Sequence, residues 1–269
     1  MCIIYHAESS RDLTISRVKS ENINIGQKHN SPSIRYISMH THKKIFNIRR
    51  KQQLASIFWR NYSIMIDRIN RNALLRKWTK ANLNVPLLSD KKEHFIFINQ
   101  QILKNGDIDY LEFGVYKGES ISTWININNS ERSRFFGFDS FEGLPTQWFP
   151  DAPRGTFSTG GEIPLINDIR AKFIKGLFQE TLHPFLETFE RKNRLVIHID
   201  SDLYSSAFFV LMSLHPLFMK GDIVIFDDFI DPIGEFLLFE EYCSSFYVTP
   251  KLLSMVVWKG LADKVAFMF

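Results

Sequence analysis

The fold is decided by the stretch Tyr110-Leu-Glu112-Phe-Gly114-Val-Tyr-Lys-Gly118-Glu-Ser120. It begins as an apolar run typical of a buried strand and continues into a turn with two glycines and the polar start of a helix. Glycine lets the backbone approach a ligand closely, and a helix N-terminus presents N–H groups to an anion. The stretch therefore predicts a strand, a turn and a helix that bind a nucleotide-type ligand.

A carboxylate follows the next predicted strand, Phe135-Phe-Gly-Phe-Asp139. In nucleotide-binding α/β folds, an acid about 20 residues beyond the glycine turn accepts hydrogen bonds from ribose hydroxyls. The spacing Gly114-x-x-x-Gly118 is wider than the Gly-x-Gly-x-x-Gly used for a pyrophosphate. The pattern therefore favours a nucleotide-type ligand other than NAD, and it disfavours an NAD-linked dehydrogenase.

Strands and helices alternate from residue 90 onward. Asp90 is a suitable N-cap for a helix that ends near Asn105-Gly106. Apolar runs predict strands at 108–113, 134–138, 172–174, 195–199 and 222–226, with helices at 119–127, 179–189, 205–218 and 234–245. Residues 254–258 and 264–269 predict a hairpin at the sheet edge. This order predicts a three-layer, Rossmann-like α/β fold whose ligands bind at the carboxyl ends of mostly parallel strands.

Two of these strands end in acidic clusters. Asp200 and Asp202 follow the strand at 195–199, and Asp227 and Asp228 follow the strand at 222–226. Carboxylates from neighbouring strand ends repel one another unless a proton or a cation intervenes, and oxygen ligands suit Mg²⁺. The alternative is that some of these acids cap the following helices, above all Asp202. We expect His198 to be a packed histidine that faces away from Asp200.

Charge divides the chain unevenly. Residues 1–92 hold 18 of the 33 Lys and Arg residues but only 5 of the 29 Asp and Glu residues. We predict a basic N-terminal extension over 1–89, poorly ordered at first and then helical within 51–80, and a ligand-binding domain over 90–269. The extension could bind RNA or an anionic surface, or form a helical lid or a contact between copies of a homo-oligomer. Nucleic-acid binding is not expected because no known RNA-binding motif is present.

Composition sets the broad class of protein. The chain has 269 residues, 45% of them hydrophobic, which is enough for a substantial core. With only two cysteines, Cys2 and Cys243, we expect no disulfide framework. Neither an apolar run of membrane-spanning length nor a signal peptide is apparent, so we predict a cytoplasmic protein.

Five ordered blocks carry a family resemblance. They are Glu112-Phe-Gly-Val-Tyr-Lys-Gly-Glu-Ser120, Gly137-Phe-Asp-Ser-Phe-Glu-Gly-Leu-Pro145, Lys175-Gly-Leu-Phe-Gln-Glu-Thr-Leu182, His198-Ile-Asp-Ser-Asp-Leu-Tyr204 and Phe226-Asp-Asp228. In this order they resemble the macrocin O-methyltransferase (TylF/MycF-like) family of class I S-adenosylmethionine-dependent methyltransferases. The resemblance implies a seven-stranded sheet with an antiparallel last strand. It also implies methyl transfer to a hydroxyl, often on a natural-product sugar, with S-adenosylmethionine as donor and Mg²⁺ as metal.

The resemblance also implies roles for individual residues. The turn around the methionine part of the donor would comprise Glu112, Gly114, Gly118 and Ser120. Asp139 would hold the ribose, and the segment with Gly176, Phe178 and Gln179 would lie along the adenine, although Phe178 could equally be a core residue.

On the metal side, the family ligands match Asp200, Asp227 and Asp228. The chemistry of methyl transfer also needs a proton acceptor, and either Asp200 or Asp202 could accept the hydroxyl proton. The lysine base of catechol-type methyltransferases has no counterpart, because Leu203 stands three residues after Asp200. That lysine-dependent mechanism is therefore not transferred.

Three functions remain open. The first is a Mg²⁺-assisted O-methyltransferase acting on a sugar or another small hydroxylated metabolite. The second is a methyltransferase for a larger anionic acceptor, RNA or a glycan, recruited by the basic extension. The third is a protein that binds S-adenosylmethionine without turnover. The intact set of Asp200, Asp227 and Asp228 favours an enzyme over the third possibility.

Overall fold

The computed structural model describes residue 63 and residues 65–269. The prediction of a poorly ordered start, and the part of the predicted helical region before residue 63, lie outside the described residues. Residues 65–81 are helical, as the pattern predicts. Among the described residues, no helix is long and apolar enough to cross a membrane.

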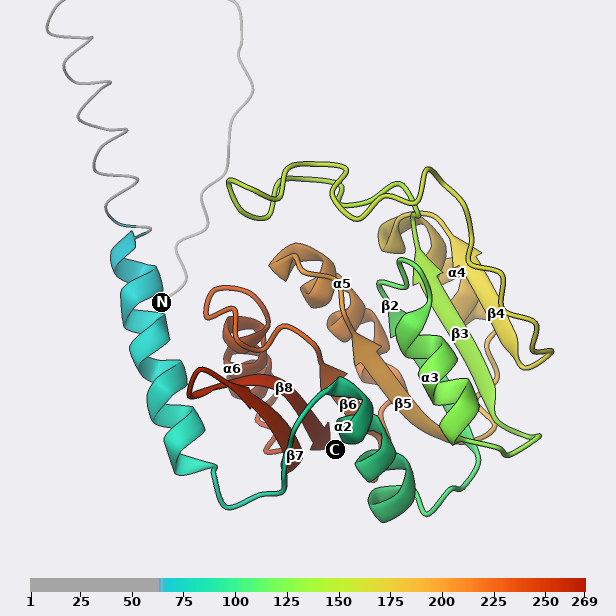
Figure 1. The fold of residues 1–269 in the computed structure, drawn as a ribbon, viewed down its shortest axis with the longest axis horizontal. Coiled ribbons are helices and arrows are strands. Elements are labelled where there is room, and N and C mark those ends of the chain that lie inside the picture. Colours follow the sequence, from blue (N-terminus) through green and yellow to red (C-terminus); the bar gives the residue numbers. More distant parts are fainter. Residues whose placement is uncertain (1–62, 64) are drawn as a thin grey trace, which may run out of the picture. The chain divides into compact units, whose positions relative to one another are not determined.

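Eight strands form one sheet in the described part of the chain, in the order β1-β7-β8-β6-β5-β2-β3-β4 (Figure 1). The strands are β1 Leu87–Leu88, β2 Ile108–Phe113, β3 Arg134–Asp139, β4 Ala171–Lys175, β5 Arg194–Ile199, β6 Ile223–Phe226, β7 Lys251–Trp258 and β8 Leu261–Met268. Neighbouring strands from β4 to β6 pair in parallel, whereas β8 pairs antiparallel with both β6 and β7. The predicted fold class, a mostly parallel sheet that ends in an antiparallel hairpin, is confirmed.

Helices cover both faces of this sheet. They are α2 Lys91–Phe97, continued by the wider turns of η1 Ile98–Ile102, then α3 Glu119–Ile127, α4 Phe178–Thr188, α5 Tyr204–Leu214 with the short η2 His215–Leu217, and α6 Glu235–Phe246. Side chains of α2 and α3 pack with Tyr110 on one face, and those of α4, α5 and α6 pack with Phe113 on the other. Tyr110 and Phe113 point to opposite faces because side chains alternate along a strand.

The expected number of strands, seven, is one too few. The additional strand, β1, has two residues and pairs in parallel with β7, Leu87 opposite Met255 and Leu88 opposite Val256. Two residues are too short to show the alternation by which a strand is recognised in sequence. The strand forms because β7 offers it an open edge.

The helix at 65–81 contributes to the core of the sheet domain. Leu75 is fully buried, and the Trp78 ring lies 5.1 Å from that of Phe229. The Thr79 hydroxyl accepts a hydrogen bond from the Ala262 amide at the start of β8. The division of the chain at residue 90 stays a prediction, but these residues share their core with the domain predicted to follow them.

The connection between β3 and β4 positions the site. Residues 140–170 contain no helix and run as a long loop over the carboxyl ends of the strands (Figure 1). Within it, Gly143 has a φ of 80° and lies so close to Gly155 and Thr156 that a Cβ would overlap their backbone. This folded loop brings Leu144 and Phe157 to the pocket described next.

Candidate active site

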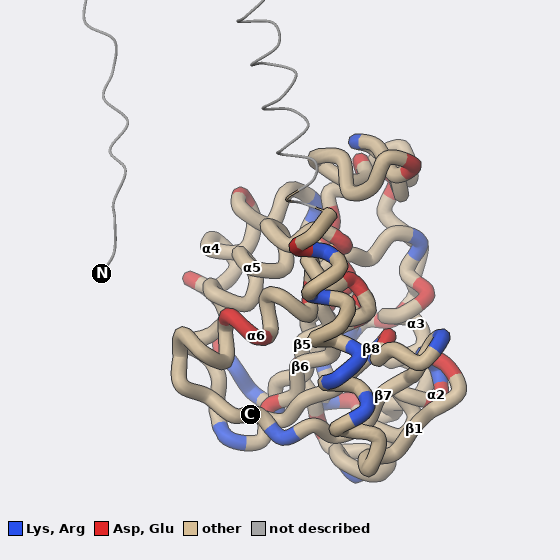
Figure 2. Tube along the Cα trace, turned by 90° about the vertical axis from the view of Figure 1, so that its left-hand side faces the viewer, with Lys and Arg blue, Asp and Glu red and all other residues tan. Residues whose placement is uncertain are grey.

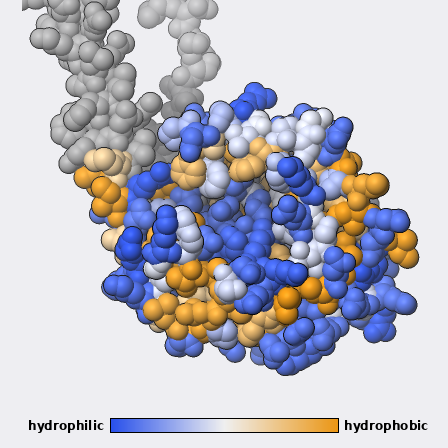
Figure 3. All heavy atoms as spheres, viewed as in Figure 1, coloured by the Kyte–Doolittle hydropathy of each residue, from blue (hydrophilic) through white to orange (hydrophobic). Residues whose placement is uncertain are grey.

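A pocket of about 260 Å³ lies at the carboxyl ends of the central strands. Six of the residues predicted to bind the donor line it, namely Gly114, Ser120, Asp139, Gly176, Phe178 and Gln179. Two of the predicted acids, Asp200 and Asp202, line it as well. On the face shown in Figure 3, the surface is hydrophilic at its centre and bordered by hydrophobic residues.

Gly114 fixes the turn at the end of β2. Its φ is 99°, and a Cβ there would overlap the backbone carbonyl oxygen of Asp200. A side chain is therefore excluded both by the backbone conformation and by space. Gly118, with a φ of 81°, is the N-cap of α3, and the helix has no side-chain cap. The N-terminus of α3 thus meets the pocket through Glu119 and Ser120.

Asp139, the last residue of β3, connects this turn to its own strand. One carboxylate oxygen, Oδ2, accepts hydrogen bonds from the amides of Val115 and Tyr116, each at 2.8 Å. The other, Oδ1, accepts one from the Phe141 amide at 2.7 Å. Since each carboxylate oxygen has two lone-pair positions, a single position on Oδ1 remains for a ligand.

The segment that follows β4 forms another wall of the pocket. Gly176 has a φ of 145°, and its amide donates to the carbonyl of Asp139 at 2.9 Å. The Phe178 ring packs edge-on against Phe113, with ring centroids 5.5 Å apart, and it also lines the pocket. One side of the Phe178 ring therefore packs in the core and the other lines the pocket, so both predicted alternatives apply.

Glu112 lies outside the pocket. It is fully buried and does not line the pocket. Its Oε2 accepts a hydrogen bond from the Tyr110 hydroxyl at 2.5 Å and lies 3.6 Å from His198 Nδ1. Oε1 has no hydrogen-bond partner in the structure. Glu112 thus belongs to a buried polar network between β2 and β5 rather than to the wall of the donor pocket.

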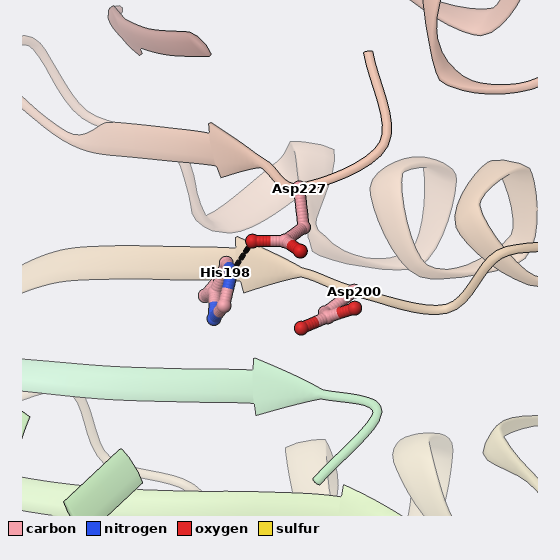
Figure 4. Close-up of side chains that lie close together, drawn as sticks. All are labelled: His198, Asp200 and Asp227. Carbon is pink, nitrogen blue, oxygen red and sulfur yellow. Dashed lines mark hydrogen bonds and ion pairs between the residues drawn. The ribbon is translucent and has the colours of Figure 1, made fainter. Parts of the chain in front are cut away.

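Asp200 and Asp227 converge at the ends of adjacent strands. The last residues of β5 and β6, Ile199 and Phe226, are paired in register, so the acids that follow are neighbours. Their carboxylates point into the same space (Figure 4). The Lys91 ammonium, at the start of α2, lies between them, 2.7 Å from Asp200 Oδ2 and 2.9 Å from Asp227 Oδ1. Lys264 Nζ, from β8, lies 3.5 Å from Asp227 Oδ2.

These contacts set the charge states. Burial alone would raise the pKa of Asp227, but the hydrogen bond from His198 and the charge of Lys91 hold it well below its usual range. Burial and the nearby Asp227 raise the pKa of Asp200. Figure 2 shows basic and acidic residues close together along the trace above β5 and β6. The carboxylates are thus held together by cationic side chains of the protein itself.

The other two acids form a pair. Asp202 has a φ of 60°, and its charge interacts with that of Asp228. Burial, followed by the charge of Asp200, raises the pKa of Asp202 to about 7. Burial and Asp200 likewise raise the pKa of Asp228. The Asp228 amide donates to Glu235 Oε2 at 2.9 Å.

His198 is buried, as expected of a packed histidine, but the expectation that it faces away from Asp200 is wrong. Residues two apart on a strand point to the same face. Nitrogen and oxygen atoms of His198, Asp200 and Asp227 all lie within 4.8 Å of one another. Nε2 contacts Asp227 Oδ1 at 3.3 Å, and Nδ1 contacts the Tyr110 hydroxyl at 2.9 Å. Burial lowers the pKa of His198, yet the hydrogen bonds with Asp227 and Glu112 outweigh it and raise the pKa to about 9.

The group formed by His198, Asp200 and Asp227 fits a divalent cation only in part. Of the three predicted metal ligands, Asp200 and Asp227 face a common space with His198, whereas Asp228 is not part of this group. Sequence reasoning missed Lys91 and Lys264, which occupy part of that space. Their positions next to Asp90 and Asp263 carried no local signal, because each meets the acids only through the tertiary fold.

The fold has counterparts among solved structures. The structure is similar to the O-methyltransferase NovP, with a TM-score of 0.52, 20% identity, and coverage of 66% of this chain and 78% of that one. It is similar to the calicheamicin methyltransferase CalS11, with a TM-score of 0.52, 19% identity, and coverage of 75% and 92%. No match was found among the curated proteins. The chain therefore shares its fold with these two methyltransferases.

A family model matches the part of the sequence that contains the acids. Residues 162–253 match the model of the macrocin O-methyltransferase (TylF) family. This segment runs from the loop before β4 into β7, and it contains Gly176, Phe178 and all four acids of the cluster. Over these residues, the match confirms the family resemblance predicted from the motifs and supports a methyltransferase.

Proposed function

We propose that the chain is an S-adenosylmethionine-dependent O-methyltransferase that acts, with the help of Mg²⁺, on a hydroxyl of a sugar or another small hydroxylated metabolite. One observation carries the proposal. A single pocket joins the glycine turn after β2 to the acids that follow β5. Methyl transfer requires a donor and a hydroxyl to meet in line, and a shared pocket supports that alignment.

The donor side of the pocket would bind S-adenosylmethionine mainly through the protein backbone. S-adenosylmethionine supplies a methyl group already activated on a sulfonium, so the protein needs chiefly to hold and orient it. Gly114 and Gly176 line the pocket with backbone alone, and the side of the Phe178 ring that lines the pocket offers a surface for the adenine. Asp139 has one free acceptor position on Oδ1, which suits one ribose hydroxyl rather than both.

The acid side handles the acceptor hydroxyl. Asp202 lines the pocket and is not engaged by either lysine, so we assign it the hydroxyl proton. Asp200 and Asp227 would hold the metal, with Asp228 beside them. Bound Mg²⁺ would supply a positive charge that favours the deprotonated acceptor. His198, held by the Tyr110 hydroxyl, orients the carboxylate of Asp227.

Calorimetric titration with S-adenosylhomocysteine tests the donor site. We expect binding by the full chain and a loss of at least about tenfold, roughly 1.4 kcal/mol, in Asp139→Ala. Asp151→Ala, which removes an exposed carboxylate from the β3–β4 loop, is the control and should bind as the wild type does. Equal affinities for all three proteins would remove Asp139 from the donor site.

Turnover tests the rest of the proposal. Transfer of a labelled methyl group to a panel of small sugars and phenols should occur and should fall on addition of EDTA. If EDTA leaves the rate unchanged, the role of Mg²⁺ is rejected while methyl transfer stands. If S-adenosylhomocysteine binds but no member of the panel is methylated, the assignment of a small hydroxylated acceptor is rejected.

A further inference from the structure

Lys91 occupies an unusual place in the acid cluster. It is the first residue of α2, directly after the N-cap Asp90, and its side chain reaches away from the helix to two strand ends. Only 30% of the side chain is exposed. Its ammonium contacts one oxygen of Asp200 and one of Asp227, which is the bridging position between the two carboxylates.

Lys91 contacts Asp200 and Asp227 through fully charged groups. The Lys91 Nζ lies 2.7 Å from Asp200 Oδ2 and 2.9 Å from Asp227 Oδ1, which are the distances of direct ion pairs between an ammonium and two carboxylates. Two charges in contact in a partly buried site interact far more strongly than they would at an exposed surface.

The two carboxylates depend on Lys91 to different degrees. Asp227 has further cationic partners in Lys264 and His198. Among the ion pairs of the described residues, Asp200 has Lys91 alone. Without the ammonium, Asp200 would be a largely buried carboxylate next to another one, which is strongly unfavourable unless a second cation enters.

We propose that Lys91 is a built-in cation that takes the bridging position between Asp200 and Asp227, so that a divalent cation binds there only when the Lys91 side chain leaves. This inference rests on the proposed use of Mg²⁺ at the same site. Two cations cannot share contact with the same pair of oxygens, because their mutual repulsion acts at a few ångströms. Lys91 therefore sets the metal affinity of the site.

The adjacent residue provides a matched control. Lys92 has the same side chain on the same helix turn, but it is exposed and has no ion pair among the described residues. Lys91→Met and Lys92→Met remove the same charge from the chain. Only the first removes it from the bridging position, so the two variants separate a local effect from a change in net charge.

Mn²⁺ titration of the full chain, followed by electron paramagnetic resonance, tests the inference without any acceptor. We expect Lys91→Met to bind Mn²⁺ at least about tenfold more tightly than the wild type, and Lys92→Met to bind it as the wild type does. Lys91→Arg, which keeps a cation in place, should stay within about threefold of the wild type. Unchanged or weaker binding by Lys91→Met, or tight binding by Lys91→Arg, would overturn the inference.

S-adenosylhomocysteine binding by the same samples separates this inference from the proposed function. If no variant binds Mn²⁺ but all bind S-adenosylhomocysteine, both the inference and the role of Mg²⁺ fail while the donor site stands. If Lys91→Met alone gains Mn²⁺ affinity and no variant binds S-adenosylhomocysteine, the inference holds and the methyltransferase assignment fails.

Discussion

The two sides of the pocket depend on different kinds of interaction. The side formed by β2, β3 and the segment after β4 depends on backbone conformation, with Gly114 and Gly176 at positive φ and Asp139 engaged by three amides. The side formed by the ends of β5 and β6 depends on charged side chains, with Lys91 between two carboxylates. One side is specified by steric limits, and the other by a balance of charges.

This difference determines how each side can fail. A substitution in the glycine turn acts by overlap, which neither pH nor salt relieves. A substitution in the acid cluster acts by leaving a charge unbalanced, and another cation can restore the balance. The donor side should therefore lose its structure and its ligand together, whereas the acid side should lose its cation and keep the donor.

Gly114→Ala should have the largest effect. Its Cβ would overlap the Asp200 carbonyl, in a backbone conformation that alanine disfavours. We expect a loss of about 4 kcal/mol in the free energy of unfolding and no measurable binding of S-adenosylhomocysteine. Urea unfolding followed by circular dichroism measures the first quantity, and calorimetry measures the second.

Gly260→Ala is the control for backbone strain. Gly260 lies in the β7–β8 turn with a φ of 78°, and a Cβ there would meet no atom within 4 Å. We expect it to cost about 1 to 2 kcal/mol, the price of the left-handed conformation alone. If the two alanine variants are equally stable, the close approach of Gly114 to Asp200 does not exist in solution.

Asp227→Asn comes next in size and acts on the acid side. It removes the charge that faces Lys91, Lys264 and His198, so we expect a loss of about 3 kcal/mol of stability. Mn²⁺ binding should be abolished, while the affinity for S-adenosylhomocysteine should change by less than about threefold. A large loss of donor affinity would show that the two sides of the pocket are not separable.

Asp263→Asn is the matched control for that variant. Asp263 also pairs with Lys264, at 3.0 Å, but it has no contact with Lys91 or His198 among the described ion pairs. We expect a loss of less than about 1 kcal/mol and unchanged Mn²⁺ binding. Thermal unfolding with and without Mn²⁺ compares the two variants directly.

The difference between the donor side and the acid side of the pocket also explains which features could be predicted from the sequence. β2 and α3 begin and end where their patterns indicate, at Ile108–Phe113 and Glu119–Ile127, because an apolar run and two glycines mark the boundaries locally. The predicted helix at 205–218 instead ends at Leu214 and continues as the tighter η2, which contains Pro216. Proline lacks the N–H that a continuing α-helix would use.

The acid side was predictable only in part. Strand order brings Asp200 and Asp227 together, and this follows from a parallel sheet. Lys91, however, lies 109 residues before Asp200 in the chain, and nothing near it in sequence indicates that contact. Asp228 follows Asp227 directly, yet it is not part of the group that His198, Asp200 and Asp227 form. Charge partners of this kind depend on the packed tertiary structure.

Phe178→Leu should have the smallest effect. It tests whether the Phe178 ring contributes to ligand binding in the pocket or only to packing in the core. Leucine keeps much of the packing against Phe113 but removes the aromatic face that lines the pocket. If adenine stacks on the ring, affinity for S-adenosylhomocysteine should fall by about fivefold, near 1 kcal/mol. Phe185→Leu, within the Phe136 and Phe138 cluster, should lower stability by a similar amount and leave affinity unchanged. Equal affinity in both variants would make Phe178 a core residue only, and the donor side would then rest on the backbone and Asp139 alone.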